Sequence, residues 1–165
     1  MGGRWRWRPA PVVVPVRRCE LVGRRRDVLG AIALGGALGA EARYGLGLAV
    51  AHRAGEWPWA TLLANVSGCL LIGVLMVVIT ELVTAHRLVR PFLGVGVLGG
   101  YTTFSAYAVE VLAQGDAGRG GLAVVYFVVT PLVAVLACAV GVASTRLVAR
   151  WIDRGPGRAG ASGSA

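Results

Sequence analysis

Residues 94–107 read Gly-Val-Gly-Val-Leu-Gly-Gly-Tyr-Thr-Thr-Phe-Ser-Ala-Tyr, and they lie within an apolar run of the chain. Glycine inside a helix costs about 1 kcal/mol relative to alanine. Four glycines followed by a Thr-Thr-x-Ser cluster therefore predict a helix that is broken at mid-membrane. Such a break frees backbone groups, which are tolerated where they bind an ion or line a cavity. The alternative is a continuous glycine-rich helix whose hydroxyls bond to their own backbone.

This run is one of four, at residues 28–51, 59–82, 92–113 and 122–148. The chain is 56% hydrophobic and 15% charged, with a mean hydropathy of +0.67, whereas a soluble domain carries roughly 25% charged residues. Each run has the roughly 20 residues needed to cross a bilayer. Because backbone groups in lipid must pair within their own segment, the runs are expected to be helices. The sequence thus predicts an all-α membrane protein with four transmembrane helices.

The four runs form one predicted transmembrane domain, residues 28–150, between two tails. Residues 1–27 are basic and proline-rich, and residues 151–165 are rich in glycine, serine and alanine, so both tails are expected to be disordered. The net charge is +9, but the charges avoid the apolar runs, and nucleic acid is not an expected partner. The three cysteines form no C-x-x-C pair, and no catalytic or nucleotide-binding motif indicates an enzyme.

All 17 basic residues are arginines, and they are divided unequally between the two sides of the predicted bundle. Fourteen lie before the first run, in residues 83–91 or in the C-terminal stretch from Arg146 onward, whereas only Arg53 and Arg119 fall on the opposite side; Arg43 lies inside the first run. By the positive-inside rule, this bias predicts a multi-pass protein of the plasma membrane with both termini in the cytoplasm.

The first run combines small residues with a charged pair. Ala31, Gly35 and Gly39 are spaced by four, which predicts a smooth face for close helix approach. Arg43, beside Glu41, is expected either to attract anions into an aqueous vestibule or to extend to the membrane interface. The sequence favours neither role for Arg43.

Two further polar residues lie inside apolar runs. Asn65 by itself favours a hydrogen bond that joins two helices, although its amide also offers two donors to an anion. Thr130 precedes Pro131, and it is expected either to face a pore or to satisfy the carbonyl that the proline frees. The structural role is slightly favoured for Thr130.

Phe104 and Tyr107 are three residues apart and so share a helix face. An aromatic ring has a positive edge, which can solvate a small anion without trapping it. Without the neighbouring hydroxyls, a lipid-facing aromatic pair would be the ordinary interpretation.

Three motifs, on successive runs, together resemble the CrcB/Fluc family of fluoride channels. They are Gly-Gly-Ala-Leu-Gly-Ala-Glu-Ala-Arg-Tyr (35–44), Thr-Leu-Leu-Ala-Asn-Val-Ser-Gly (61–68) and Gly-Gly-Tyr-Thr-Thr-Phe-Ser (99–105). The resemblance covers about residues 28–148. It implies an antiparallel dimer of four-helix subunits, with two pores that let fluoride leave the cytoplasm passively and so confer fluoride resistance.

The resemblance also implies roles for individual residues. A structural sodium ion at the dimer interface would be held by the carbonyls of Gly99 and Thr102. Arg43 and Glu110 would lie in a vestibule. The fluoride pore would be lined by Asn65, Thr103, Phe104, Ser105, Tyr107 and Thr130. Tyr107 stands where phenylalanine is usual in the family, and Thr130 stands where serine is usual.

The arginine distribution bears on the expected dimer. An antiparallel homodimer requires one sequence to insert in both orientations, and so requires similar numbers of arginines on the two sides of the bundle. Fourteen arginines on one side against two on the other do not meet this requirement. We therefore expect a partner that is a related subunit of opposite orientation.

Two other functions fit four short helices: a small proton-coupled multidrug-type exporter, for which Glu41 is the candidate carboxylate, and a non-conducting subunit of a heterodimeric channel.

Overall fold

The computed structural model describes residues 18–50 and 56–153, and within them every regular element is helical. The elements are α1 (Arg18–Ala49), α2 (Trp59–Val77), the π-helical η1 (Val78–Leu82) and η2 (Arg90–Val97), α3 (Leu98–Tyr101), α4 (Ser105–Asp116) and α5 (Gly120–Asp153). Three segments of this described part are long and apolar enough to cross a membrane: Trp59–Leu82, Arg90–Asp116 and Gly120–Ile152. The predicted all-helical membrane protein is confirmed.

Helix α1 differs from the sequence prediction in two respects. It is not among the three apolar segments, because Glu41, Arg43 and several glycines lower its hydropathy. It also begins at Arg18, so residues 18–27 are helical although the sequence assigned them to a tail. Arginine and leucine are good helix formers, which accounts for this extension. At the other end, α5 continues to Asp153, beyond the predicted boundary at residue 150. Residues 1–17 and 154–165, where disorder was predicted, lie outside the described residues.

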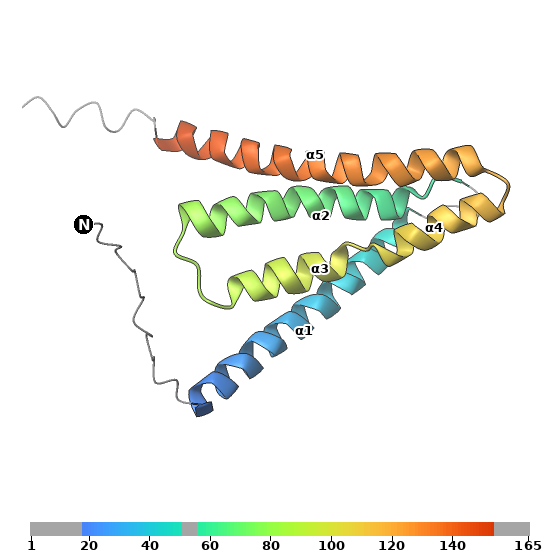
Figure 1. The fold of residues 1–165 in the computed structure, drawn as a ribbon. Coiled ribbons are helices and arrows are strands. Elements are labelled where there is room, and N and C mark those ends of the chain that lie inside the picture. The colour runs from blue at the N-terminus through green and yellow to red at the C-terminus, as the bar shows by residue number, and fades with distance from the viewer. Residues whose placement is uncertain (1–17, 51–55, 154–165) are drawn as a thin grey trace, which may run out of the picture.

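Figure 1 shows α2 lying alongside α5, with η2 and α3 on its other side and α1 running diagonally across η2 and α3. Helix α4 continues beyond α3 and lies against α5. The beginning of α1, the connection between η1 and η2 and the end of α5 lie at one end of the bundle. Two ion pairs form at this end, Arg87–Asp27 at 2.6 Å and Arg146–Glu81 at 2.5 Å.

Glycines bring α1 into backbone contact with the third apolar segment. A Cβ atom at Gly35 would overlap the carbonyl oxygen of Phe92, and one at Gly39 would overlap the carbonyl oxygen of Val97. Both glycines are buried. The predicted close helix approach is confirmed at these two positions, and it holds α1 against η2 and α3.

Candidate functional site

The Thr-Thr-x-Ser cluster lies between α3 and α4. Helix α3 ends at Tyr101, Thr102 is extended with φ −80° and ψ 156°, and α4 begins at Ser105. Thr102 donates two hydrogen bonds to the carbonyl of Leu98, from its N–H at 3.0 Å and from Oγ1 at 2.9 Å. Residues 102–104, hereafter the linker, therefore separate two helical segments.

Asn65 of α2 binds the linker through two hydrogen bonds. Its Nδ2 donates to the carbonyl of Thr103 at 3.0 Å, and its Oδ1 accepts from the N–H of Thr103 at 2.8 Å. The side chain thus satisfies both backbone groups of one linker residue. The joining role that the sequence favoured for Asn65 is confirmed, with a backbone as the partner. An amide nitrogen carries two hydrogens, so one N–H of Asn65 is left for another acceptor.

The linker also redirects the donors that two carbonyls would receive in a continuous helix. In an α-helix the N–H of Thr103 would bind the carbonyl of Gly99, and the N–H of Ala106 would bind that of Thr102. Here the first N–H donates to Asn65, and the second donates to Thr103 Oγ1 at 3.2 Å. The carbonyls of Gly99 and Thr102 therefore lose their regular helical donors.

These two carbonyls are hard oxygen donors, the type that binds hard cations such as sodium. Gly99 is exposed on the surface of the subunit. Residues 18–50 and 56–153 contain no group of three or more histidine, cysteine, aspartate or glutamate side chains placed to hold a metal ion. The donor chemistry at Gly99 and Thr102 fits a sodium ion bound through the backbone.

A cleft of about 560 Å³ opens beside the linker, between α2, α4 and α5. Five of the six residues predicted for the pore line it: Asn65, Thr103, Phe104, Tyr107 and Thr130. The sixth, Ser105, does not; its exposed hydroxyl lies 3.3 Å from that of Thr103. The remaining wall is formed by Thr102, Phe127, Val128, Pro131, Leu132 and Ala134. The fold thus gathers residues from three helices and the linker around one cleft.

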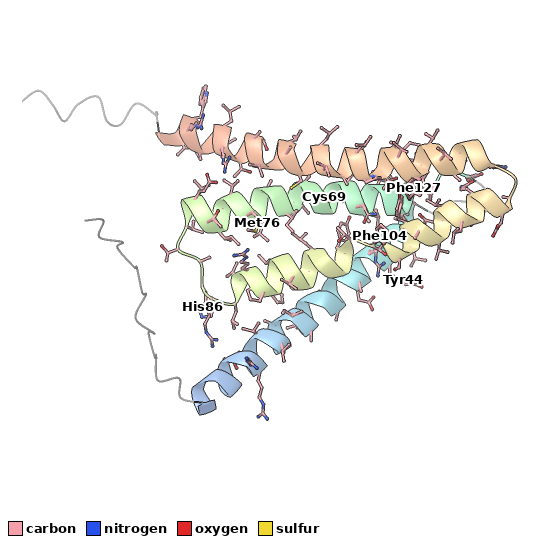
Figure 2. All side chains as sticks on the ribbon, viewed as in Figure 1. Tyr44, Cys69, Met76, His86, Phe104 and Phe127 are labelled. Carbon is pink, nitrogen blue, oxygen red and sulfur yellow. The ribbon has the colours of Figure 1, made fainter. Side chains whose placement is uncertain are left out.

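Aromatic rings extend from this cleft toward the start of α2. Phe104 is 78% exposed, and its ring centroid lies 5.6 Å from that of Tyr107, which is only 4% exposed. Tyr107 contacts Tyr126 at 5.4 Å, and Tyr126 contacts Trp57 edge-on at 5.4 Å. Figure 2 places Phe104 at the junction of α3 and α4. The predicted pair therefore belongs to a longer aromatic row.

Thr130 is 3% exposed, and its hydroxyl has no hydrogen-bond partner among the described residues. The carbonyl of Phe127, four residues before Pro131, accepts its hydrogen bond from the hydroxyl of Tyr107 at 2.6 Å. Thr130 does not perform the structural role that the sequence slightly favoured. Thr130 lines the cleft, but its hydroxyl oxygen is buried.

Arg43 and Glu110 line a second cleft of about 310 Å³, and Thr103 lines both clefts. The carboxylate of Glu110 accepts hydrogen bonds from Thr61 Oγ1 at 2.6 Å and from the Tyr126 hydroxyl at 2.8 Å. Arg43 is half-buried and takes part in neither ion pair of the described residues. The two predicted vestibule residues are thus brought together.

Two residues that bind Glu110 were not selected from the sequence. Thr61 and Tyr126 connect α2 and α5 to Glu110. Tyr126 lies four residues before Thr130 and so shares its helix face, which is the signal that would have identified it. Thr61 offered no comparable signal, because its partner is 49 residues away.

Residues 30–142, more than two thirds of the chain, match the family model described as CrcB-like protein, Camphor Resistance (CrcB). The chain belongs to this family. Among its relatives, the fluoride-specific ion channel FluC 2 of Streptomyces avermitilis is 48% identical over 119 residues, which are 72% of this chain and 75% of the relative. Fluoride-specific ion channel FluC 1 of Streptomyces coelicolor is 48% identical over 124 residues, 75% of this chain and 80% of the relative. Fluoride-specific ion channel FluC of Chloroflexus aurantiacus is 40% identical over 122 residues, 73% of this chain and 94% of the relative.

Proposed function

We propose that this chain is a subunit of a fluoride-specific ion channel, not an enzyme, and that it lets fluoride leave the cytoplasm passively. The observation that carries the proposal is the 560 Å³ cleft, where an amide, hydroxyls and three aromatic rings converge without a charged side chain. Membership of the CrcB family and the names of the relatives support the same function.

The cleft supplies the groups that a dehydrated fluoride ion needs. The Thr130 hydroxyl and the remaining N–H of Asn65 donate hydrogen bonds to the ion, and the positive edges of the Phe104 and Tyr107 rings add weaker solvation. None of these groups carries a full positive charge that would trap the anion. A membrane potential that is negative inside drives the anion outward by about 2.3 kcal/mol per 100 mV.

The proposal places the protein in the plasma membrane, with α1 as the fourth span and both termini in the cytoplasm. The arginine distribution supports this orientation, since the connection between η1 and η2, which contains Arg87, and the end of α5, which contains Arg146 and Arg150, lie at the same end of the bundle as the beginning of α1. The linker then lies near the middle of the membrane. Glu41 and Arg43 lie toward the opposite end of α1, near the second cleft.

The functional unit is proposed to be an antiparallel dimer with a related subunit of opposite orientation. The carbonyls of Gly99 and Thr102 from each subunit would hold a sodium ion at the interface. Two carbonyls from one subunit leave a hard cation short of ligands, and a second subunit supplies the others. When bound, the ion neutralises these carbonyl dipoles and holds the linkers in place.

Fluoride efflux from liposomes, followed with a fluoride electrode, tests the function. The chain is reconstituted alone and together with its related subunit, and chloride retention serves as the control for leakage. Fluoride release with chloride retained is the expected result, and dependence on the second subunit supports the heterodimer. An intact antiparallel homodimer that conducts would overturn the heterodimer. Proton-dependent dye efflux without fluoride release would indicate an exporter, and no flux in either preparation would indicate a non-conducting subunit.

A further inference from the structure

Pro131 lies inside α5 and has no backbone N–H. In a continuous helix, the N–H of residue 131 would bind the carbonyl of Phe127. That carbonyl is therefore left without its helical donor, close to the wall of the 560 Å³ cleft, which both Phe127 and Pro131 line. An unpaired carbonyl oxygen beside an anion path would repel the anion and would also be costly to bury.

Tyr107 of α4 supplies the missing donor. Its hydroxyl donates to the Phe127 carbonyl at 2.6 Å, and its ring stacks on that of Phe127 with centroids 6.2 Å apart and planes 16° apart. A tyrosine hydroxyl has one proton, and this bond uses it. The hydroxyl of Tyr107 is thus not available as a donor to an anion, although the ring still lines the cleft.

The same bond acts on the geometry of the pore wall. Thr130, whose buried hydroxyl lacks a partner, lies between Phe127 and Pro131 in the stretch of α5 where one regular backbone bond is missing. The Tyr107 bond ties this stretch to α4, and hence to the helix that follows the linker.

We propose that Tyr107 is a positioning residue whose hydroxyl satisfies the backbone carbonyl that Pro131 leaves unpaired, and thereby holds the α5 wall of the ion path in place. This inference rests on the proposed channel function for its effect on flux. It gives the tyrosine at position 107 a defined role: the hydroxyl binds the backbone of α5 and not the permeating ion.

A double-mutant comparison separates this role from direct ion binding. Tyr107→Phe removes the hydroxyl that donates to the Phe127 carbonyl. Pro131→Ala gives residue 131 a backbone N–H, which can then donate to the same carbonyl. We expect Tyr107→Phe alone to lower fluoride efflux about fivefold, the factor that corresponds to one ordinary hydrogen bond. In the Pro131→Ala background the same change should have no further effect, so the double variant conducts as well as Pro131→Ala. An equal loss in both backgrounds, or no loss in either, would overturn the proposal.

The carbonyl itself provides a measurement that does not depend on transport. The chain contains only three phenylalanines, so labelling with carbonyl-¹³C phenylalanine yields few signals, and Phe127→Leu identifies that of Phe127. Tyr107→Phe adds a fourth phenylalanine signal, which Phe127→Leu in the same background distinguishes from that of Phe127. The Phe127 signal should move when Tyr107→Phe is made in the wild-type chain and stay in place when it is made in Pro131→Ala. A signal that is unchanged in the wild-type background would refute the hydrogen bond. Expected shifts without fluoride flux in any variant, wild type included, would refute the channel function and leave the positioning bond standing.

Discussion

The two sides of the third apolar segment are built differently. On the α1 side, glycines at 35 and 39 allow backbone to meet backbone, and nothing larger than a hydrogen fits between the helices. On the α5 side, Tyr107, Tyr126 and Phe127 hold the helices apart and connect through hydroxyls and ring contacts. The first interface is sealed at Gly35 and Gly39, with clefts of about 530 Å³ and 310 Å³ only at its two ends, whereas the second leaves the 560 Å³ cleft. Side-chain size thus decides how closely the helices approach at each contact.

The largest effect is expected from a substitution on the sealed side, the interface between α1 and the third apolar segment. Gly39→Leu places a side chain against the carbonyl of Val97, where even a Cβ atom overlaps. We expect a destabilisation of about 3 kcal/mol or more, at the upper end for overpacked sites, and the loss of monodisperse protein in detergent. Gly30→Leu, on the same helix where an added Cβ meets nothing, is the matched control and should be at least as stable as wild type. A stable Gly39→Leu variant would contradict the close approach.

The next largest effect is expected at Asn65. Its side chain connects α2 to the linker, which lies in the third apolar segment between the α1 side and the α5 side. Asn65→Ala leaves the N–H and the carbonyl of Thr103 without their partners, at a cost of about 1–3 kcal/mol for each buried group. We expect a lower thermal midpoint and a fluoride efflux reduced at least about tenfold, the factor for 1.4 kcal/mol. Asn65→Asp retains the acceptor for the Thr103 N–H but places a carboxylate oxygen against the Thr103 carbonyl, so it should be no more stable than Asn65→Ala. Equal stability of Asn65→Ala and wild type would rule out a stabilising role for the two hydrogen bonds between Asn65 and Thr103.

A substitution at Thr130 changes the α5 side, which borders the 560 Å³ cleft, without disturbing the fold. Thr130→Val removes a buried hydroxyl that has no protein partner, so stability should be unchanged or slightly higher. Fluoride efflux should nevertheless fall about tenfold, because the ion loses a charge-assisted hydrogen bond. Thr130→Ser keeps the hydroxyl and should retain most of the flux. A valine variant that conducts normally would show that Thr130 does not contact the ion.

The smallest expected effect concerns the Arg87–Asp27 pair, which joins α1 to the connection before η2 at the outer end of the sealed side. Both side chains are about half exposed, and exposed ion pairs contribute about 0–1 kcal/mol. Asp27→Asn should therefore shift the thermal midpoint only slightly and leave fluoride efflux unchanged. A loss of folded protein comparable to that of Gly39→Leu would mean that the ion pair, and not the glycine face, holds α1 in place.

The sequence by itself was sufficient for features that depend on neighbours along the chain. Apolar runs of about 20 residues predict helices, because a backbone in lipid must satisfy itself. The spacing of Gly35 and Gly39 predicts a face for close packing, since residues four apart share one side of a helix. The end of α3 at Tyr101 also has a local explanation in the glycines and hydroxyls that surround it.

Only the tertiary structure decided which role each polar side chain takes. Asn65 binds the backbone 38 residues away, Thr61 binds Glu110 49 residues away, and Tyr107 binds the Phe127 carbonyl 20 residues away. The sequence left Asn65 and Thr130 with two possible roles each, because an amide or a hydroxyl serves a backbone group or a bound ion equally well. The choice depends on which groups are left unpaired when the helices meet, and this is settled by packing. Asn65 and Tyr107 pair with backbone groups left by the linker and by Pro131, whereas the buried hydroxyl of Thr130 has no hydrogen-bond partner among the described residues.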